Sequence, residues 1–322
     1  MTSYIPLRRT PIRERASVLF LEHGNIDRDD GGLVLIDADG RTPIPVAGLT
    51  CLMLEPGTRI SHAAVKLCAE LGCLIVWTGE GGVRIYSATE PGGASARHLL
   101  HQARIALDDT LRLNVVRAMY AFRFGEEAPQ RRSIEQLRGM EGVRVREAYK
   151  RLAAEHGVDW QGRNYDSKQW RAADVPNKCL SAATACLYGL AEAAILAAGY
   201  APSIGFLHSG NPRAFVFDVA DLFKFETVVP AAFKIAGAIA RGEDPRPDRP
   251  SAYQRGRESA AQKEVRPDVA VRHACRDAFR RERTLDLIVP AIHDMLAASG
   301  VEAPADAPEA GPPAIPVTEE AA

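Results

Sequence analysis

The sequence predicts an α+β protein, with a small N-terminal β-rich domain followed by a larger, mostly α-helical C-terminal domain. Two observations support this prediction. Up to about residue 88, short runs of β-branched and aliphatic residues alternate with turns that contain Gly, Asp and Pro. From about residue 97, apolar residues recur at the 3.6-residue spacing of amphipathic helices. A chain of 322 residues is long enough to give both parts a core.

The β-rich domain is expected to span residues 1–88. Its strand-like runs, separated by turn residues, are SVLFLEHG, GLVLIDADG, TCLMLE, CLIVWTG and VRIYSA. One helix is expected among them, because Ser61 is a suitable N-cap and Gly72 a suitable C-terminal residue for the segment SHAAVKLCAELG. Residues 89–96, TEPGGASA, have the composition of a linker.

The α-helical domain is expected to span residues 97–300. Its most apolar segment, residues 179–200, is about long enough to cross a bilayer. The segment nevertheless contains Ser181, Thr184 and Glu192, so we interpret it as the central helix of a globular core.

Two further segments lack the composition of a packed core. Residues 242–267 combine low hydrophobicity with repeated Pro and Arg, which is typical of a mobile basic loop. Residues 301–322 form an acidic tail rich in Pro and Ala, which we expect to be disordered.

The composition argues against several classes of protein. A net charge of −1 is not that of a uniformly basic nucleic-acid-binding protein. The six cysteines form no C-x-x-C pair and no cluster with histidines at zinc spacing, so neither a zinc finger nor a disulfide framework is indicated. The N-terminus does not have the pattern of a secretory signal. We therefore expect a cytoplasmic protein that is not associated with a membrane.

Glu141 occurs where helical periodicity predicts burial. At about 100° per residue, it lies within the apolar stripe of its helix. The stripe consists of Ile134, Leu137, Val145, Ala148 and Leu152. A carboxylate at such a position must be neutralised, pair with a cation or bind a metal, because an unpaired buried charge costs several kcal/mol.

The segment GFLHSGNPRAFVFDVADLFKFE places three more ionisable residues among apolar ones. A helix that begins near Asp218 turns Asp221 inward together with its apolar residues. These apolar residues are Phe225, Val228 and Ala232. His208 lies in the loop before that helix start. With Glu141, these side chains form a mixed nitrogen and oxygen set suited to a divalent ion, which would activate a hydroxyl and stabilise charge on a phosphate.

A purely structural explanation of the same residues stays open at this point. Asp218 and Asp221 are also suited to be the N-cap and a first-turn acid of a helix. Glu141 can pair with an arginine, and His208 can be a satisfied polar residue of its loop.

Three segments resemble the family of CRISPR-associated integrases, the adaptation nucleases that insert new spacers, in subtype I-E. They are EQLRGMEGVRVREAY, AATACLYGLAEAAILAAGYAPSIGFLHSGNPRAFVFDVADLFKFE and MLEPGTRISHAAVKLCAELGCLIVWTGEGGVRIYSA. The match extends over roughly residues 5–235. The resemblance implies a small β domain and a larger helical domain in a homodimer. It also implies that two such dimers flank a dimer of the small second CRISPR adaptation protein and hold a short duplex DNA with 3′ overhangs.

The resemblance assigns the metal ligands, for Mg²⁺ or Mn²⁺, to Glu141, His208 and Asp221. It adds Asp218 as a fourth acidic member of the catalytic site. The implied reaction is a transesterification, in which the 3′-hydroxyl of the captured DNA attacks a phosphodiester at the edge of a CRISPR repeat.

The resemblance also implies DNA contacts. Arg59 and Arg84 match basic family positions, and Tyr165 and Tyr188 match tyrosines that line the pocket for the flanking motif of the incoming DNA. Arg41 and Lys224 are further candidates for phosphate contact. The match has two departures. His23 stands at the position where this subtype uses an aromatic wedge, and the basic stretch 242–267 is longer than the family's usual connection.

The leading hypothesis is therefore a metal-dependent DNA endonuclease and integrase of CRISPR adaptation. Two alternatives remain. One is a stand-alone nuclease for branched DNA repair intermediates, which would use water as the nucleophile. The other is a non-catalytic DNA-binding scaffold, in which the acids and the histidine form structural pairs.

Overall fold

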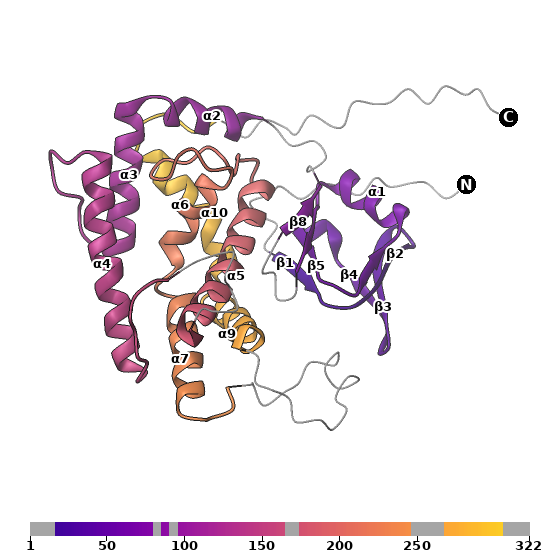
Figure 1. Cartoon of the computed structure of the whole chain (residues 1–322). Coiled ribbons are helices and arrows are strands. Elements are labelled where there is room, and N and C mark those ends of the chain that lie inside the picture. Colours follow the sequence, from indigo (N-terminus) through magenta and orange to yellow (C-terminus); the bar gives the residue numbers. More distant parts are fainter. Residues whose placement is uncertain (1–16, 80–84, 90–95, 165–173, 246–266, 305–322) are drawn as a thin grey trace.

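The computed structural model describes residues 17–79, 85–89, 96–164, 174–245 and 267–304 (Figure 1). Within them, the N-terminal part consists of strands with one α-helix, and the part after it is mostly α-helical. The predicted α+β fold class is therefore confirmed. Most of the predicted linker, basic loop and acidic tail lies outside the described residues.

Four strands form the first sheet, in the order β1-β5-β7-β8. They are β1 (Ser17–Leu21), β5 (Leu49–Leu54), β7 (Leu74–Thr78) and β8 (Ile85–Ala88). The first three run parallel, and β8 pairs antiparallel with β7. Leu52 and Leu74, in the two central strands, are fully buried. Continuous apolar runs such as TCLMLE are typical of strands that are covered on both faces.

The second sheet has the order β4-β3-β2-β6. Its strands are β2 (Gly24–Asp29), β3 (Gly32–Asp37), β4 (Gly40–Ile44) and β6 (Thr58–Ile60). The predicted strand runs contain β1, β3, β7 and β8 and all but the first residue of β5, whereas β2, β4 and β6 were not predicted. Strands β2 and β4 are mostly exposed and rich in charged or polar residues, so they lack the hydrophobic pattern that identifies a strand.

Helix α1 (His62–Leu71) packs against both sheets. The hydroxyl of Ser61 accepts the Ala64 N–H at 3.2 Å, and Gly72 ends the helix in the left-handed conformation at φ +69°. Both predicted caps are therefore confirmed. Leu67 of α1 lies in one apolar cluster with Ile26 of the second sheet and Leu52 of the first. A short 3₁₀ helix, η2 (Val46–Gly48), lies between β4 and β5 in the chain.

Eight α-helices follow in the described part of the chain. They are α2 (Arg97–Ala106), α3 (Asp109–Phe124), α4 (Ile134–Glu155), α5 (Val175–Ala197), α6 (Ala214–Phe223), α7 (Val228–Ala240), α9 (Pro267–Arg281) and α10 (Thr284–Ala297). Figure 1 shows α5 at the centre, with α3 and α4 forming the side farthest from the sheets. Helix α5 contacts α6, α7, α9 and α10.

Helix α5 is the apolar segment that we interpreted as a core helix. Within the described part of the chain, it is the one helix long and apolar enough to cross a membrane. In the structure, 78% of its most apolar 18-residue window is buried inside the protein. At its C-terminal half, Ala193 and Ala197 pack against Cys51 and Met53 of β5 and Val76 of β7. The central helix therefore belongs to the helical core and also covers the first sheet.

One predicted helix is divided in two. The run from Asp218 to about residue 241, treated as continuous in the sequence, separates into α6 and α7. The hydroxyl of Thr227 donates to the Phe223 carbonyl at 2.6 Å, which satisfies an acceptor at the end of α6. Pro230 lies in the first turn of α7, where a missing N–H costs little. The predicted alignment of Asp221 with Val228 and Ala232 on one helix is therefore wrong.

Candidate active site

The predicted ionisable residues meet where α3, α4 and α6 pack together. Glu141 comes from α4, Asp218 and Asp221 come from α6, and His208 lies in the loop before α6. The side chains of Glu141 and Asp221 are only 12% and 14% exposed. His208 is 25% exposed and Asp218 is fully buried. Carboxylates that far from water require cationic or hydrogen-bonding partners.

Helix α4 turns Glu141 inward as its periodicity predicts. Ser133 caps the helix through a capping box with Gln136. Leu137 and Leu152, on the same stripe as Glu141, are buried in the helical core. Burial raises the pKa of the Glu141 carboxyl, and the charge of Arg123 only partly opposes that rise.

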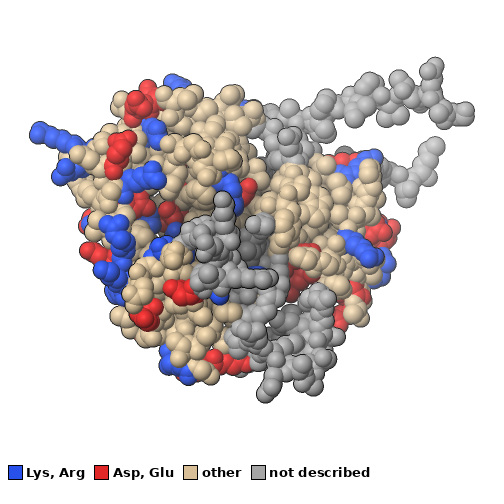
Figure 2. All heavy atoms as spheres, in the orientation of Figure 1, with Lys and Arg blue, Asp and Glu red and all other residues tan. Residues whose placement is uncertain are grey.

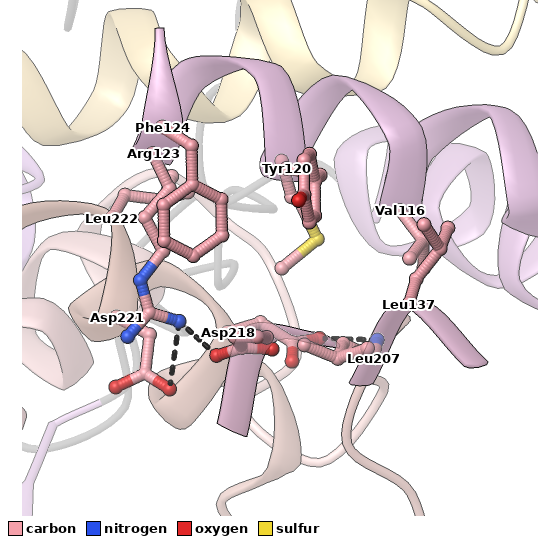
Figure 3. Close-up of a pocket in the computed structure, with 11 residues that line it drawn as sticks. Val116, Tyr120, Arg123, Phe124, Leu137, Leu207, Asp218, Asp221 and Leu222 are labelled. Atoms are coloured by element: carbon pink, nitrogen blue, oxygen red, sulfur yellow. Dashed lines mark hydrogen bonds and ion pairs between the residues drawn. The ribbon is translucent and has the colours of Figure 1, made fainter. Parts of the chain in front are cut away.

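Arg123 of α3 supplies the cation that faces these carboxylates. Its Nη1 donates to Glu141 Oε1 and lies 3.6 Å from Asp221 Oδ2. In Figure 3, the Arg123 side chain points toward Asp221. The guanidinium also lies 5.5 Å from the ring centres of Phe124 and Phe225. Arg123 therefore joins acids from two separate helices through one positive charge.

Asp218 organises the loop that carries His208. Its Oδ2 accepts the backbone N–H groups of Phe206 at 2.5 Å and Leu207 at 3.2 Å. Its Oδ1 accepts the His208 N–H at 3.0 Å and lies 2.7 Å from His208 Nδ1. With Nδ1 held in this way, Nε2 is the ring nitrogen that remains for another ligand.

The alternative in which Asp218 is a helix N-cap is wrong. Helix α6 begins one turn earlier, at Ala214, with Arg213 in the N-cap position. Asp218 is therefore inside the helix, and its carboxylate binds a loop instead of the helix start. Burial raises the pKa of Asp218, against the opposing effect of its hydrogen bond with His208. Burial lowers the pKa of His208, but Asp218 and the nearby charges of Asp221 and Glu141 outweigh burial and leave this pKa raised.

Residues far away in the sequence hold the same loop in place. Gln102 of α2 donates to the carbonyls of Ala201 and Ile204, at 3.1 and 2.7 Å. Arg112 of α3 donates from Nε to the Phe206 carbonyl at 2.6 Å. Gly205 permits the tight path, because a Cβ there would lie 2.4 Å from the His208 carbonyl oxygen. The position of His208 is thus determined by α2, α3 and α6 together.

Lys224 and Tyr188 complete the surroundings of Asp221. Lys224 Nζ lies 3.2 Å from Asp221 Oδ1. Burial raises the pKa of Asp221, but the charges of Lys224 and Arg123 more than offset this and lower it. Lys224 also lies 6.0 Å from the ring centre of Tyr188, and Arg213 lies 5.8 Å from it. Tyr188 of α5 is therefore next to the acidic residues.

The side chains of Glu141, Asp221 and His208 are of the chemical types that bind a divalent ion. Two carboxylates and one imidazole are suitable ligands for Mg²⁺ or Mn²⁺, and the carboxylates already face a cation. As the side chains stand, no three His, Cys, Asp or Glu side chains of the described residues are arranged to hold one ion. Arg123 Nη1 contacts one oxygen of each carboxylate, Glu141 Oε1 and Asp221 Oδ2.

Comparison with known proteins identifies the family. The family model for the CRISPR associated protein Cas1 matches residues 18–125 and 123–238. The chain belongs to the Cas1 family. It is 57% identical over 320 residues to "CRISPR-associated endonuclease Cas1 1" of Rhodospirillum rubrum, which covers 98% of this chain and 96% of that protein. It is 52% identical over 316 residues to the Cas1 endonuclease of Escherichia coli K12, with 98% and 96% covered. The predicted resemblance is therefore confirmed.

Solved Cas1 structures share the fold. A crystal structure of a TtCas1–DNA complex matches this Cas1 family member with a TM-score of 0.71 and 41% identity. That match covers 89% of this chain and 97% of the other. The fold is also shared by TM1797, a Cas1 protein from Thermotoga maritima, at a TM-score of 0.57 and 16% identity over 91% of this chain and 100% of the other.

The other predicted DNA-contact residues of this Cas1 family member lie away from the acids or cannot be described. Arg59 is exposed on β6, and Arg41 on β4 pairs with Asp29 at 2.6 Å. Both belong to the second sheet, on the opposite side of Figure 1 from α4. Arg84 and Tyr165 lie outside the described residues.

Arg123 was not predicted as the partner of Glu141, although pairing of Glu141 with an arginine stayed open. The signal was present. Val116, Met119 and Tyr120 of α3 are buried, and residue 123 continues their spacing of three to four residues. An arginine on an apolar stripe needs an acidic partner, as Glu141 on its stripe needs a cation. Gln102 and Arg112 gave no comparable signal, because their partners are backbone carbonyls.

Proposed function

We propose that this Cas1 family member is a metal-dependent DNA endonuclease and integrase of CRISPR adaptation. It inserts short duplex DNA into a CRISPR repeat array through attack of a 3′-hydroxyl on a phosphodiester. Relatives at 57% and 52% identity carry the name CRISPR-associated endonuclease, which supports a nuclease. The observation that carries the proposal is the meeting of two largely buried carboxylates, Glu141 and Asp221, with His208 held through its Nδ1.

In this proposal, Glu141, Asp221 and Nε2 of His208 hold the ion, Mg²⁺ or Mn²⁺. The ion supplies charge neutralisation at the phosphate and activation of the attacking hydroxyl. Asp218 is a positioning residue, because it accepts both the loop amides and the His208 ring. One P–O bond forms to the attacking 3′-oxygen and one breaks to the leaving 3′-oxygen, so no covalent protein nucleophile is required.

DNA contacts follow from cations and aromatic rings near the acids. Lys224 and Tyr188 are beside Asp221, where they can meet a phosphate and an unpaired base of the incoming strand. Exposed Lys and Arg side chains gather with acidic ones on the α3 and α4 side of the molecule (Figure 2). We propose Arg59, Arg84 and Tyr165 as further contacts. Arg41 is a weaker candidate, because it already pairs with Asp29.

The assembly is proposed from the same family membership. A homodimer binds duplex DNA with 3′ overhangs, and a dimer of the small second CRISPR adaptation protein bridges two such dimers. A DNA complex of TtCas1 supports DNA binding. We further propose that residues 1–88 and 97–300 are separate domains joined by residues 89–96.

The decisive experiment is strand transfer of a labelled duplex with 3′-hydroxyl ends into a supercoiled plasmid that bears the repeat. It contains the small partner protein and Mn²⁺ or Mg²⁺, and it compares wild type with Glu141→Ala and His208→Ala. Glu147→Ala, an exposed change on the same helix as Glu141, is the matched control. We expect metal-dependent joining at the repeat edge for wild type and Glu147→Ala, and a loss of at least about a hundredfold in the two site variants.

Other results select the alternatives. Cleavage of branched DNA by wild type without the partner, and without joining, favours a stand-alone nuclease. DNA binding without any reaction favours a scaffold. Folded Glu141→Ala protein that keeps full activity removes Glu141 from the site.

A further inference from the structure

Arg123 places a positive charge against the two carboxylates to which the proposed function assigns a metal ion (Figure 3). The side chains of Arg123, Glu141 and Asp221 are 7%, 12% and 14% exposed. Water therefore solvates none of the three charges well. The buried guanidinium and the buried carboxylates stabilise one another, and removal of one leaves an opposite charge buried with less compensation.

The guanidinium makes these contacts with one end only. Nη1 serves both Glu141 and Asp221. Nε is buried without a hydrogen-bond partner among the described residues. Strong arginine–carboxylate pairs commonly use two parallel N–H donors. An end-on contact of this kind is a weaker arrangement, which a competing cation can replace.

Two aromatic rings and a second cation surround the contact between Arg123 and the carboxylates. The rings of Phe124 and Phe225, each with its centre 5.5 Å from the guanidinium carbon, attract a cation from their faces. Asp221 keeps a second cationic partner in Lys224, at 3.2 Å. Glu141, in contrast, has no ion pair with a Lys or Arg other than Arg123 in the described part of the chain. Replacement of Arg123 by another cation would therefore affect Glu141 more than Asp221.

We propose that Arg123 is an internal counter-ion of the metal site. It neutralises Glu141 and Asp221 when no divalent ion is bound, and the ion must displace its guanidinium from Glu141 in order to bind. Metal loading is then an exchange of one cation for another at carboxylates that are already in place. This inference rests on the proposed function, because it takes Glu141 and Asp221 as metal ligands.

A permanent structural ion pair is the competing explanation. In that case Arg123 orients Glu141 whether or not the metal is bound, and its loss weakens metal binding by misplacing a ligand. A counter-ion behaves in the opposite way. Its removal abolishes the competition, so the metal binds more tightly, while the metal-free protein is destabilised because Glu141 loses its cation and Asp221 keeps only Lys224.

The test is calorimetric titration of the purified full-length chain with Mn²⁺, together with thermal unfolding in EDTA and in Mn²⁺. It compares wild type with Arg123→Gln. Arg144→Gln is the matched control, because Arg144 also lies over the Phe124 ring but pairs with Glu126 and not with a site carboxylate. We expect Arg123→Gln to lower the Kd for Mn²⁺ at least about tenfold, to lower the Tm in EDTA, and to enlarge the Tm increase on adding Mn²⁺. Arg144→Gln should leave the Kd unchanged.

Folded Arg123→Gln protein that binds Mn²⁺ no more tightly than wild type overturns the inference and leaves the proposed metal site intact. If neither protein binds Mn²⁺, the metal site of the proposed function fails as well. If Arg123→Gln folds only when Mn²⁺ is present, the inference is supported. If it folds in neither condition, Arg123→Lys decides: a Kd within about threefold of wild type agrees with a counter-ion, and weakening beyond about tenfold indicates an orienting arginine.

Discussion

At the scale of single residues, the identity of an ionisable side chain predicts less than the groups that surround it. Asp218 and Asp221 are three residues apart on one helix and have different partners. Asp221 faces the cations Arg123 and Lys224, whereas Asp218 faces backbone amides and an imidazole. The sequence predicted that both acids belong to the site. It could not separate their partners, because Asp218 binds a loop whose path depends on contacts with α2 and α3.

Replacement of Asp218 tests its contribution to the loop. Asp218→Ala leaves the N–H groups of Phe206, Leu207 and His208 without their acceptor, and we expect the free energy of unfolding to fall by about 3 kcal/mol or more. Asp218→Asn keeps one acceptor oxygen and should lose less. Urea denaturation measures both, with the exposed Asp277→Ala as control. A change below about 0.5 kcal/mol for Asp218→Ala would contradict this account.

At the scale of elements, the sequence predicted the helices and strands whose hydrophobic pattern reflects their burial. The apolar strands, the caps of α1 and the stripe of α4 all follow from hydrophobic spacing and cap chemistry. The division between α6 and α7 did not, because apolar residues continue through it and a threonine side chain ends α6. Exposed strands such as β2 were not predicted either, since pairing with β3 and β6 forms them without an apolar pattern.

The start of α1 is joined to the second sheet through one hydroxyl. Ser61 caps the helix and also donates to Asp27 of β2 at 2.6 Å, which is the main reason that the pKa of Asp27 is lowered. We expect Ser61→Ala to cost about 1 kcal/mol as a lost cap. It should also move the pKa of Asp27 back toward its ordinary value in an NMR titration.

The pH dependence of this variant follows from the sign of the shift. A carboxyl whose pKa is lower in the folded protein contributes stability above its unfolded-state pKa, about 3.9, and loses it as the pH falls through the folded value. The stability difference between wild type and Ser61→Ala should therefore be larger at about pH 7 than at about pH 2.5. Equal differences at the two pH values would show that Ser61 acts on the helix alone.

At the scale of the whole molecule, sheets and helices share a boundary that contains α5. Met53 of β5 and Ala193 of α5 are both fully buried in one apolar cluster there. Glu22, which follows β1, forms an ion pair with Arg276 of α9 at the same boundary between strands and helices. The sequence predicted a central apolar helix, but the identity of the strands packed against it depends on sheet order, which periodicity does not encode.

Truncation of Met53 tests whether the two parts are coupled. We expect Met53→Ala to lower the free energy of unfolding by about 2–5 kcal/mol, because it opens a cavity at a fully buried position. Amide hydrogen exchange should become faster both in β5 and in the C-terminal half of α5. Met140→Ala, at a half-buried position on α4, serves as control. Faster exchange that is confined to the strands would indicate that the sheets unfold separately from the helices.

The pairing of Arg123 and Lys224 with Glu141 and Asp221 has a consequence for the approach of nucleic acid. Two positive side chains face two negative ones, so this group of four is electrically balanced. DNA is a polyanion, and exposed clusters of carboxylates repel it over a distance comparable to the Debye length, about 8 Å at physiological salt. Under the proposed function, the balance removes that repulsion from the place where a phosphate of the DNA would arrive. In that proposal, DNA can approach the pocket with or without a bound metal ion.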